Sequence, residues 1–110
     1  MADAQPPADT PDGAAVFPLI PPELGVHPAL LAAVHAYVFL EGSDASVVNP
    51  AVAEEAMNYL VTYLQRLKGE DLRRAREDMA TLAAFAKSEQ WPKQQVRFLQ
   101  DFLKDNGITS

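Results

Sequence analysis

The sequence predicts a small all-α protein, a four-helix bundle in either an antiparallel or an orthogonal arrangement. Apolar residues recur at three- and four-residue spacing in successive segments, which is the pattern of helices with one buried face. Proline or glycine marks most of the expected helix boundaries. The 110 residues fit a single domain. Because the chain has no cysteine, neither disulfides nor a thiolate metal site can contribute to its stability.

The first 26 residues are expected to lie outside the helices. Residues 1–15 are rich in Pro, Ala and Asp, and their small apolar area cannot offset the entropy of ordering, which predicts a disordered acidic tail. Residues 16–26 contain three prolines among large apolar side chains. This composition favours an extended proline-rich strap over a hydrophobic surface, which could belong to this chain or to a partner. Residues 27–110 form the predicted helical bundle domain.

Four helices are predicted, over residues 28–41, 50–68, 70–88 and 92–105. Pro28, Pro50 and Pro92 are each expected to be the first residue of a helix, a position where the backbone needs no amide donor. Among the residues that precede them, Asn49 is a good N-cap, whereas His27 and Trp91 are poor ones. At the end of the last helix, Gly107 is free to turn left-handed so that Ile108 folds back.

The predicted buried faces differ between the helices. Three of them have one apolar stripe: Ala53, Met57, Leu60, Val61, Leu64 and Leu67 in the second, Leu72, Ala75, Met79, Leu82, Ala83 and Ala86 in the third, and Val96, Leu99, Phe102 and Leu103 in the fourth. The first helix is apolar on every side except at His35. It is therefore either the centre of the bundle or a helix with one face against another chain.

Charge is distributed unevenly along the chain. Residues 1–65 hold eight acidic residues and no Lys or Arg, whereas all nine basic residues follow. This acidic half disfavours nucleic-acid binding, which needs a positive surface. Residues of the basic run 65–76 take part in three acid–base pairs at the four-residue spacing of helix salt bridges, namely Glu70–Arg74, Arg73–Glu77 and Arg74–Asp78. These pairs predict a solvated helix face rather than a phosphate site.

No catalytic, cofactor-binding or metal motif is present in the sequence, so no such residues are assigned. His27 and His35 are the only histidines, and eight residues along one helix separate them too far for a shared metal ion. An enzyme that uses carboxylate, tyrosine and histidine side chains is therefore the least favoured of three hypotheses. The N-terminus lacks the basic and apolar regions of a signal peptide, and the apolar stretch 29–40 is too short to span a bilayer. A cytoplasmic protein without membrane contact is expected.

The favoured hypothesis is a non-catalytic protein–protein interaction module, a small helical adaptor or accessory subunit that binds through its apolar helix and strap. The partner would be another protein or a second copy of the chain. Tyr59 and Tyr63 lie on one side of their helix, and tyrosine is enriched at interfaces. The candidate interface residues are Phe17, Leu19, Ile20, Leu31, His35, Tyr37, Phe39, Tyr59 and Tyr63. The alternative is an acidic regulator, similar to an antitoxin or inhibitor, that binds a basic partner.

Overall fold

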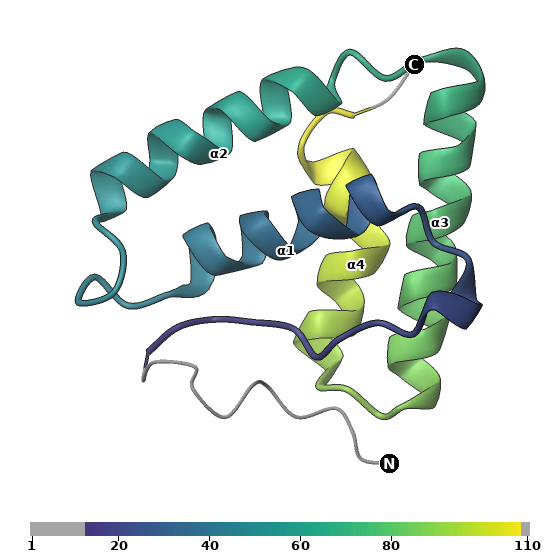
Figure 1. Cartoon of the computed structure of the whole chain (residues 1–110), viewed down its shortest axis with the longest axis horizontal. Helices are drawn as coiled ribbons and strands as arrows, with labels where there is room; N and C mark the ends of the chain where they lie inside the picture. Colours follow the sequence, from purple (N-terminus) through teal and green to yellow (C-terminus); the bar gives the residue numbers. More distant parts are fainter. Residues whose placement is uncertain (1–12, 109–110) are drawn as a thin grey trace.

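The computed structural model describes residues 13–108 and confirms the all-helical fold (Figure 1). It contains four α-helices: α1 (Pro28–Gly42), α2 (Pro50–Leu64), α3 (Gly69–Ser88) and α4 (Lys93–Asp105). Within the described range no residue is in a β-strand. The predicted disordered tail lies outside the described residues, except for residues 13–15.

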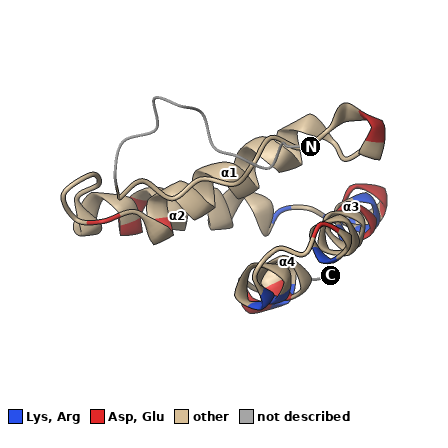
Figure 2. Ribbon diagram, turned by 90° about the horizontal axis from the view of Figure 1, so that it is seen from below, with Lys and Arg blue, Asp and Glu red and all other residues tan. Residues whose placement is uncertain are grey.

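The four helices form two hairpins that cross each other. α1 lies beside α2, α3 lies beside α4, and these two pairings hold the closest helix–helix contacts. Figure 1 shows α1 and α2 running across the direction of α3 and α4, and Figure 2 shows both later helices on one side of the α1–α2 layer. The arrangement is therefore an orthogonal bundle, and the part of the α1–α2 hairpin near its connecting loop extends beyond α3 and α4.

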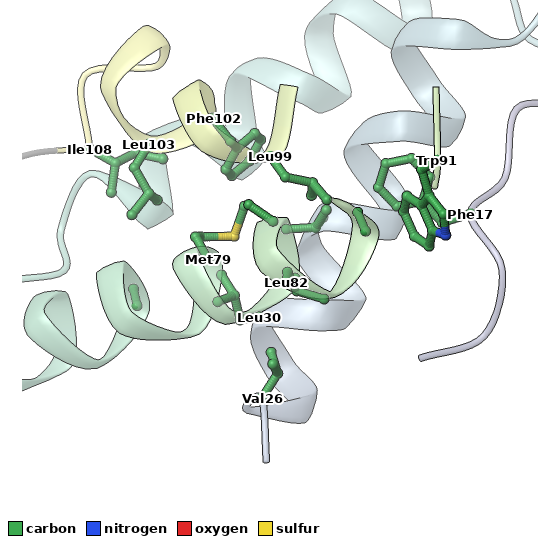
Figure 3. Close-up of a cluster of buried hydrophobic side chains, with 14 of the residues drawn as sticks. Phe17, Val26, Leu30, Met79, Leu82, Trp91, Leu99, Phe102, Leu103 and Ile108 are labelled. Carbon is green, nitrogen blue, oxygen red and sulfur yellow. The ribbon is translucent and has the colours of Figure 1, made fainter. Parts of the chain in front are cut away.

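The hydrophobic core lies where the hairpins cross. All six residues predicted for the apolar stripe of α3 are buried, as are Leu99, Phe102 and Leu103 of α4. From α1, only Leu30 and Val34 are fully buried in this core (Figure 3). The first helix therefore contacts this core along one side only, and its other sides are partly covered or exposed.

The strap contributes directly to this core. Phe17 is 6% exposed, and its ring packs against Trp91, His35 and Phe98 at centroid distances of 5.2, 5.7 and 6.1 Å. The surface beneath the strap thus belongs to the chain itself. The strap is extended except for one 3₁₀ turn, Pro22–Leu24. The three prolines predicted an extended path throughout, but a proline can also begin such a turn.

Residues 13–15 lie against the loop that connects α1 and α2. The amide of Asp44 donates to the carbonyl of Gly13 (2.8 Å), and the amide of Ala15 donates to the hydroxyl of Ser43 (2.9 Å). A Cβ at Gly42 would lie 2.9 Å from that of Ala15, so the close approach of the strap depends on this glycine. Composition assigned residues 13–15 to the disordered tail, but Gly13 and Ala15 form hydrogen bonds with this loop.

Several helix boundaries differ from those predicted. α2 ends at Leu64 instead of residue 68, because the chain tightens into i→i+3 bonds (Leu67 N to Leu64 O, 3.1 Å) that lead into the extended Lys68. Pro92 is the residue before α4 rather than its first residue. His27, which was expected to be a poor cap, accepts a hydrogen bond from the amide of Ala29 through Nδ1 at 3.0 Å.

Candidate interaction face

α2 is the least buried of the four helices. Of its 15 residues only Ala53 is fully buried, and the rest of the predicted apolar stripe (Met57, Leu60, Val61 and Leu64) is half-buried. On an adjacent stripe, Val52, Tyr59 and Tyr63 are 62%, 61% and 59% exposed. The single buried face predicted for this helix is therefore only partly covered, because α1 is the only helix that packs closely along it.

An open apolar groove of about 570 Å³ runs between α1 and α2. Eight residues line it: Ala33, Ala36, Leu40, Ala56, Tyr59, Leu60, Tyr63 and Leu64. Phe39 and Val52 extend it, because they lie three and four residues from Ala36 and Ala56 on the same helix sides. We call these ten residues the hairpin face. It carries no charged side chain, and its alanines leave room for another helix to approach closely.

The structure divides the nine candidate interface residues into two groups. Phe17 is fully buried, and Ile20, Leu31, His35 and Tyr37 are half-buried within or against the core of the chain. Leu19, Phe39, Tyr59 and Tyr63 are exposed, and three of these four belong to the hairpin face. Leu19 is the exception, because it lies on the outer side of the strap.

His35 and Tyr37 both contribute to packing rather than to an open surface. Burial lowers the pKa of His35, whose ring meets Phe17 edge-on. Burial also raises the pKa of Tyr37, with the nearby carboxylate of Glu41 as a second cause. The Tyr37 hydroxyl donates to Asn106 Oδ1 at 3.4 Å, so this tyrosine joins α1 to the end of α4.

Charged residues are segregated at the two ends of the hairpin face. At the connecting loop, Glu41, Asp44, Glu54 and Glu55 are all exposed and form what we call the acidic tip (Figure 2). At the other end, residues 66–74 contain four basic and two acidic residues. The guanidinium of Arg66 lies 4.8 Å from the centre of the Tyr63 ring, which places a positive charge directly at the border of the groove.

A second hollow, of about 650 Å³, adjoins the groove at Leu64 and lies between the starts of α1 and α3. Its arginines already have partners: Arg73 bonds Glu70 and Glu77 (2.6 and 2.7 Å), and Arg74 bonds Asp78 (3.3 Å). Two of the three predicted helix pairs are thus confirmed, whereas Glu70 bonds Arg73 in place of Arg74.

Asp78 departs from the prediction of a solvated face. It is 8% exposed, and besides Arg74 it accepts a hydrogen bond from the amide of His27 at 3.0 Å. Arg74 in turn donates to the carbonyl of Gly25 at 3.1 Å. The Arg74–Asp78 pair therefore links the start of α1 to α3, and it is more than a surface ion pair within one helix.

Seven of the ten residues of the hairpin face are not among the nine candidate interface residues: Ala33, Ala36, Leu40, Val52, Ala56, Leu60 and Leu64. A signal exists for two of them, because Val52, Ala56, Tyr59 and Tyr63 recur at four, three and four residues and form a second apolar stripe beside the predicted one. Such a wide apolar sector on a helix with only one neighbour predicts an uncovered side.

Comparison with known proteins gives no relative for this chain: no family model, no curated protein and no solved structure matches it. Among residues 13–108 no three His, Asp or Glu side chains are grouped so that they could hold a metal ion. None of the helices in this range is long and apolar enough to cross a bilayer.

Proposed function

We infer that the protein is a non-catalytic interaction module that binds another polypeptide chain through the hairpin face. The observation that carries this proposal is the exposure of Val52, Tyr59 and Tyr63, each about 60%, beside an apolar groove. A contiguous apolar surface rimmed by charge is typical of a binding site, since water contact with it costs free energy that a partner removes.

The composition of the face also supports a protein partner. Tyrosine and phenylalanine supply large contact areas and are enriched in the centre of protein interfaces, while charged residues are depleted there. The hairpin face has both properties: three aromatic side chains and no charge within the groove. The strap, in contrast, packs through Phe17 into the core of this chain, so α2 offers the partner more exposed apolar surface than the strap does.

The alternative of an acidic regulator rests on the acidic tip. Four exposed carboxylates lie at one end of the face, and no basic residue occurs before Arg66. A basic partner would be attracted to this end, and its binding would weaken strongly with salt because exposed charges are screened. Binding centred on the apolar groove would instead persist at high salt.

Site-specific photocrosslinking in the organism that makes the protein tests the proposal. A benzophenone amino acid replaces Tyr59 or Phe39 in the full chain, and in a control replaces Ala84, an exposed residue of α3. The proposal expects the same covalent adduct from both positions on the hairpin face and none from position 84. The adduct should disappear when Ala36→Arg places a charge in the groove.

Two results would contradict the interaction module. One is the absence of any adduct at Tyr59 and Phe39, and the other is an adduct of equal yield from position 84. An adduct that survives Ala36→Arg, and that is lost when the same crosslinking is done in a cell extract at 0.5 M salt, would favour the acidic regulator.

A further inference from the structure

We propose that the partner of the hairpin face is a second copy of this chain, docked face to face about a two-fold axis with the two hairpins antiparallel. This inference rests on the proposed function and names the partner of the same site. In such a dimer, α1 and α2 of each copy together form a second four-helix bundle, in which the exposed apolar stripe of α2 becomes interior.

The charges at the two ends of the face decide the orientation. An antiparallel arrangement brings the acidic tip of each copy to the end of the other that carries Arg66 and Lys68. A parallel arrangement would bring the two acidic tips together, and like charges across an interface oppose association. Because charges of opposite sign flank the face at its two ends, the region is complementary to itself only in the antiparallel arrangement.

A specific contact follows from the register. If the two-fold axis crosses α2 midway between Leu60 and Val61, then positions equally distant from it along the chain meet across the interface. Glu55 then lies beside Arg66 of the other copy, and the contact occurs twice by symmetry. Arg66 is already placed at the groove border by its position over the Tyr63 ring.

The size of the face sets the expected strength. Two helices of 15 residues form a layer about 22 Å long and about 20 Å wide. An interface of this footprint lies at the lower end of the sizes found for specific complexes. The dimer should therefore be reversible, with a dissociation constant in the micromolar range.

Sedimentation equilibrium of the purified full chain, over a concentration series from 1 to 500 µM, is the first test. The expected result is a monomer–dimer equilibrium that Tyr59→Ala weakens by at least about tenfold, while Leu19→Ala, which removes an even more exposed apolar side chain outside the face, leaves it unchanged. A monomer at every concentration would overturn the proposal, and so would equal effects of the two substitutions.

Charge exchange tests the antiparallel orientation. Arg66→Glu and Glu55→Arg should each weaken self-association, because each places like charges opposite one another at two symmetric contacts; the expected change is on the order of tenfold. An equimolar mixture of the two variants, and the double variant by itself, should regain the original affinity. Single variants that associate as the original chain does, or a mixture that gains nothing, would overturn the antiparallel dimer.

The two proposals fail in different ways. If the chain is monomeric in solution but crosslinks from Tyr59 and Phe39 to a different protein, the second copy is wrong and the interaction module stands. If the chain is monomeric and no crosslink forms, both are wrong. A crosslinked species of twice the mass of the chain supports both together.

Discussion

At the scale of single residues, two neighbouring carboxylates show how burial changes the value of an ion pair. Glu77 and Asp78 each bond an arginine four residues earlier on α3. The side chain of Glu77 is 61% exposed, whereas that of Asp78 is 11% exposed and also accepts the amide of His27. The same spacing in sequence therefore produces one surface pair and one tertiary contact.

We expect Asp78→Ala to lower the free energy of unfolding by about 2 kcal/mol, because it leaves the part-buried amide of His27 without its acceptor and removes the carboxylate that pairs with Arg74. Glu77→Ala is the matched control and should cost less than about 0.5 kcal/mol. Urea denaturation followed by circular dichroism measures both. Equal losses in the two variants would mean that the hydrogen bond from α1 contributes nothing.

His35 should make stability depend on pH. Burial disfavours its charged form and lowers its pKa in the folded chain below the ordinary value of 6.5. The unfolded chain therefore binds the proton first as the pH falls. The stability contributed by neutral His35 is complete above about pH 6.5 and is lost progressively below it, down to the pKa of the folded state.

The measurement compares the original chain with His35→Gln, which does not titrate, in urea at pH 7.5 and at pH 5.5. We expect the original chain to lose more of its unfolding free energy than His35→Gln does when the pH falls from 7.5 to 5.5. A difference that is the same at both values would mean that the His35 ring is accessible to water when the chain is folded.

At the scale of elements, the ends of α3 and α4 use the same motif with different residues. After α4, Gly107 has φ = 69°, and the amide of Ile108 donates to the carbonyl of Leu103 at 2.8 Å. After α3, Gln90 has φ = 60°, and the amide of Trp91 donates to the carbonyl of Ala86 at 2.9 Å. In both cases a residue in the left-handed region turns the next side chain into the core.

Gln90 lacks the conformational freedom that glycine provides at this position. We therefore expect Gln90→Gly to raise the free energy of unfolding by about 0.5 to 1 kcal/mol, and Gly107→Ala to lower it by about 1 kcal/mol. Thermal unfolding of the two variants and the original chain checks the signs. A loss of stability in Gln90→Gly would show that the unfolded-state entropy of glycine outweighs the relief of strain.

The elements differ in how far the sequence predicted them. The apolar stripe of α3 and the turn after α4 were correct in detail, because local spacing and a glycine determine them. The turn after α3 was not foreseen, since no glycine marks it. The end of α2 was misplaced because residues 65–67 tighten into i→i+3 bonds that the apolar spacing does not reveal. The buried role of Asp78 depends on a contact between segments distant in sequence, and local patterns carry no record of it.

At the scale of the whole molecule, the first helix shows why only part of the candidate interface is exposed. Its apolar surface predicted either a central helix or an interface, and the structure combines core, strap, α2 and an open side around it. The strap accounts for the difference: Phe17 covers one flank of α1 and leaves His35 half-buried. The uncovered side of α1 continues into α2, where the spatial arrangement leaves the second apolar stripe exposed.

Because the strap touches α1, α4 and the turn after α3 through one ring, Phe17 should stabilise the molecule as a whole. We expect Phe17→Ala to cost about 3 to 5 kcal/mol, a large part of the stability of a domain of this size. Trp91, the only tryptophan, is buried against Phe17, so its fluorescence should also shift to longer wavelength as water reaches it. Leu19→Ala, two residues away and 86% exposed, is the control and should change neither quantity measurably. If Phe17→Ala behaved like this control, the strap would be a dispensable cover and the two hairpins would be held together by the helices alone.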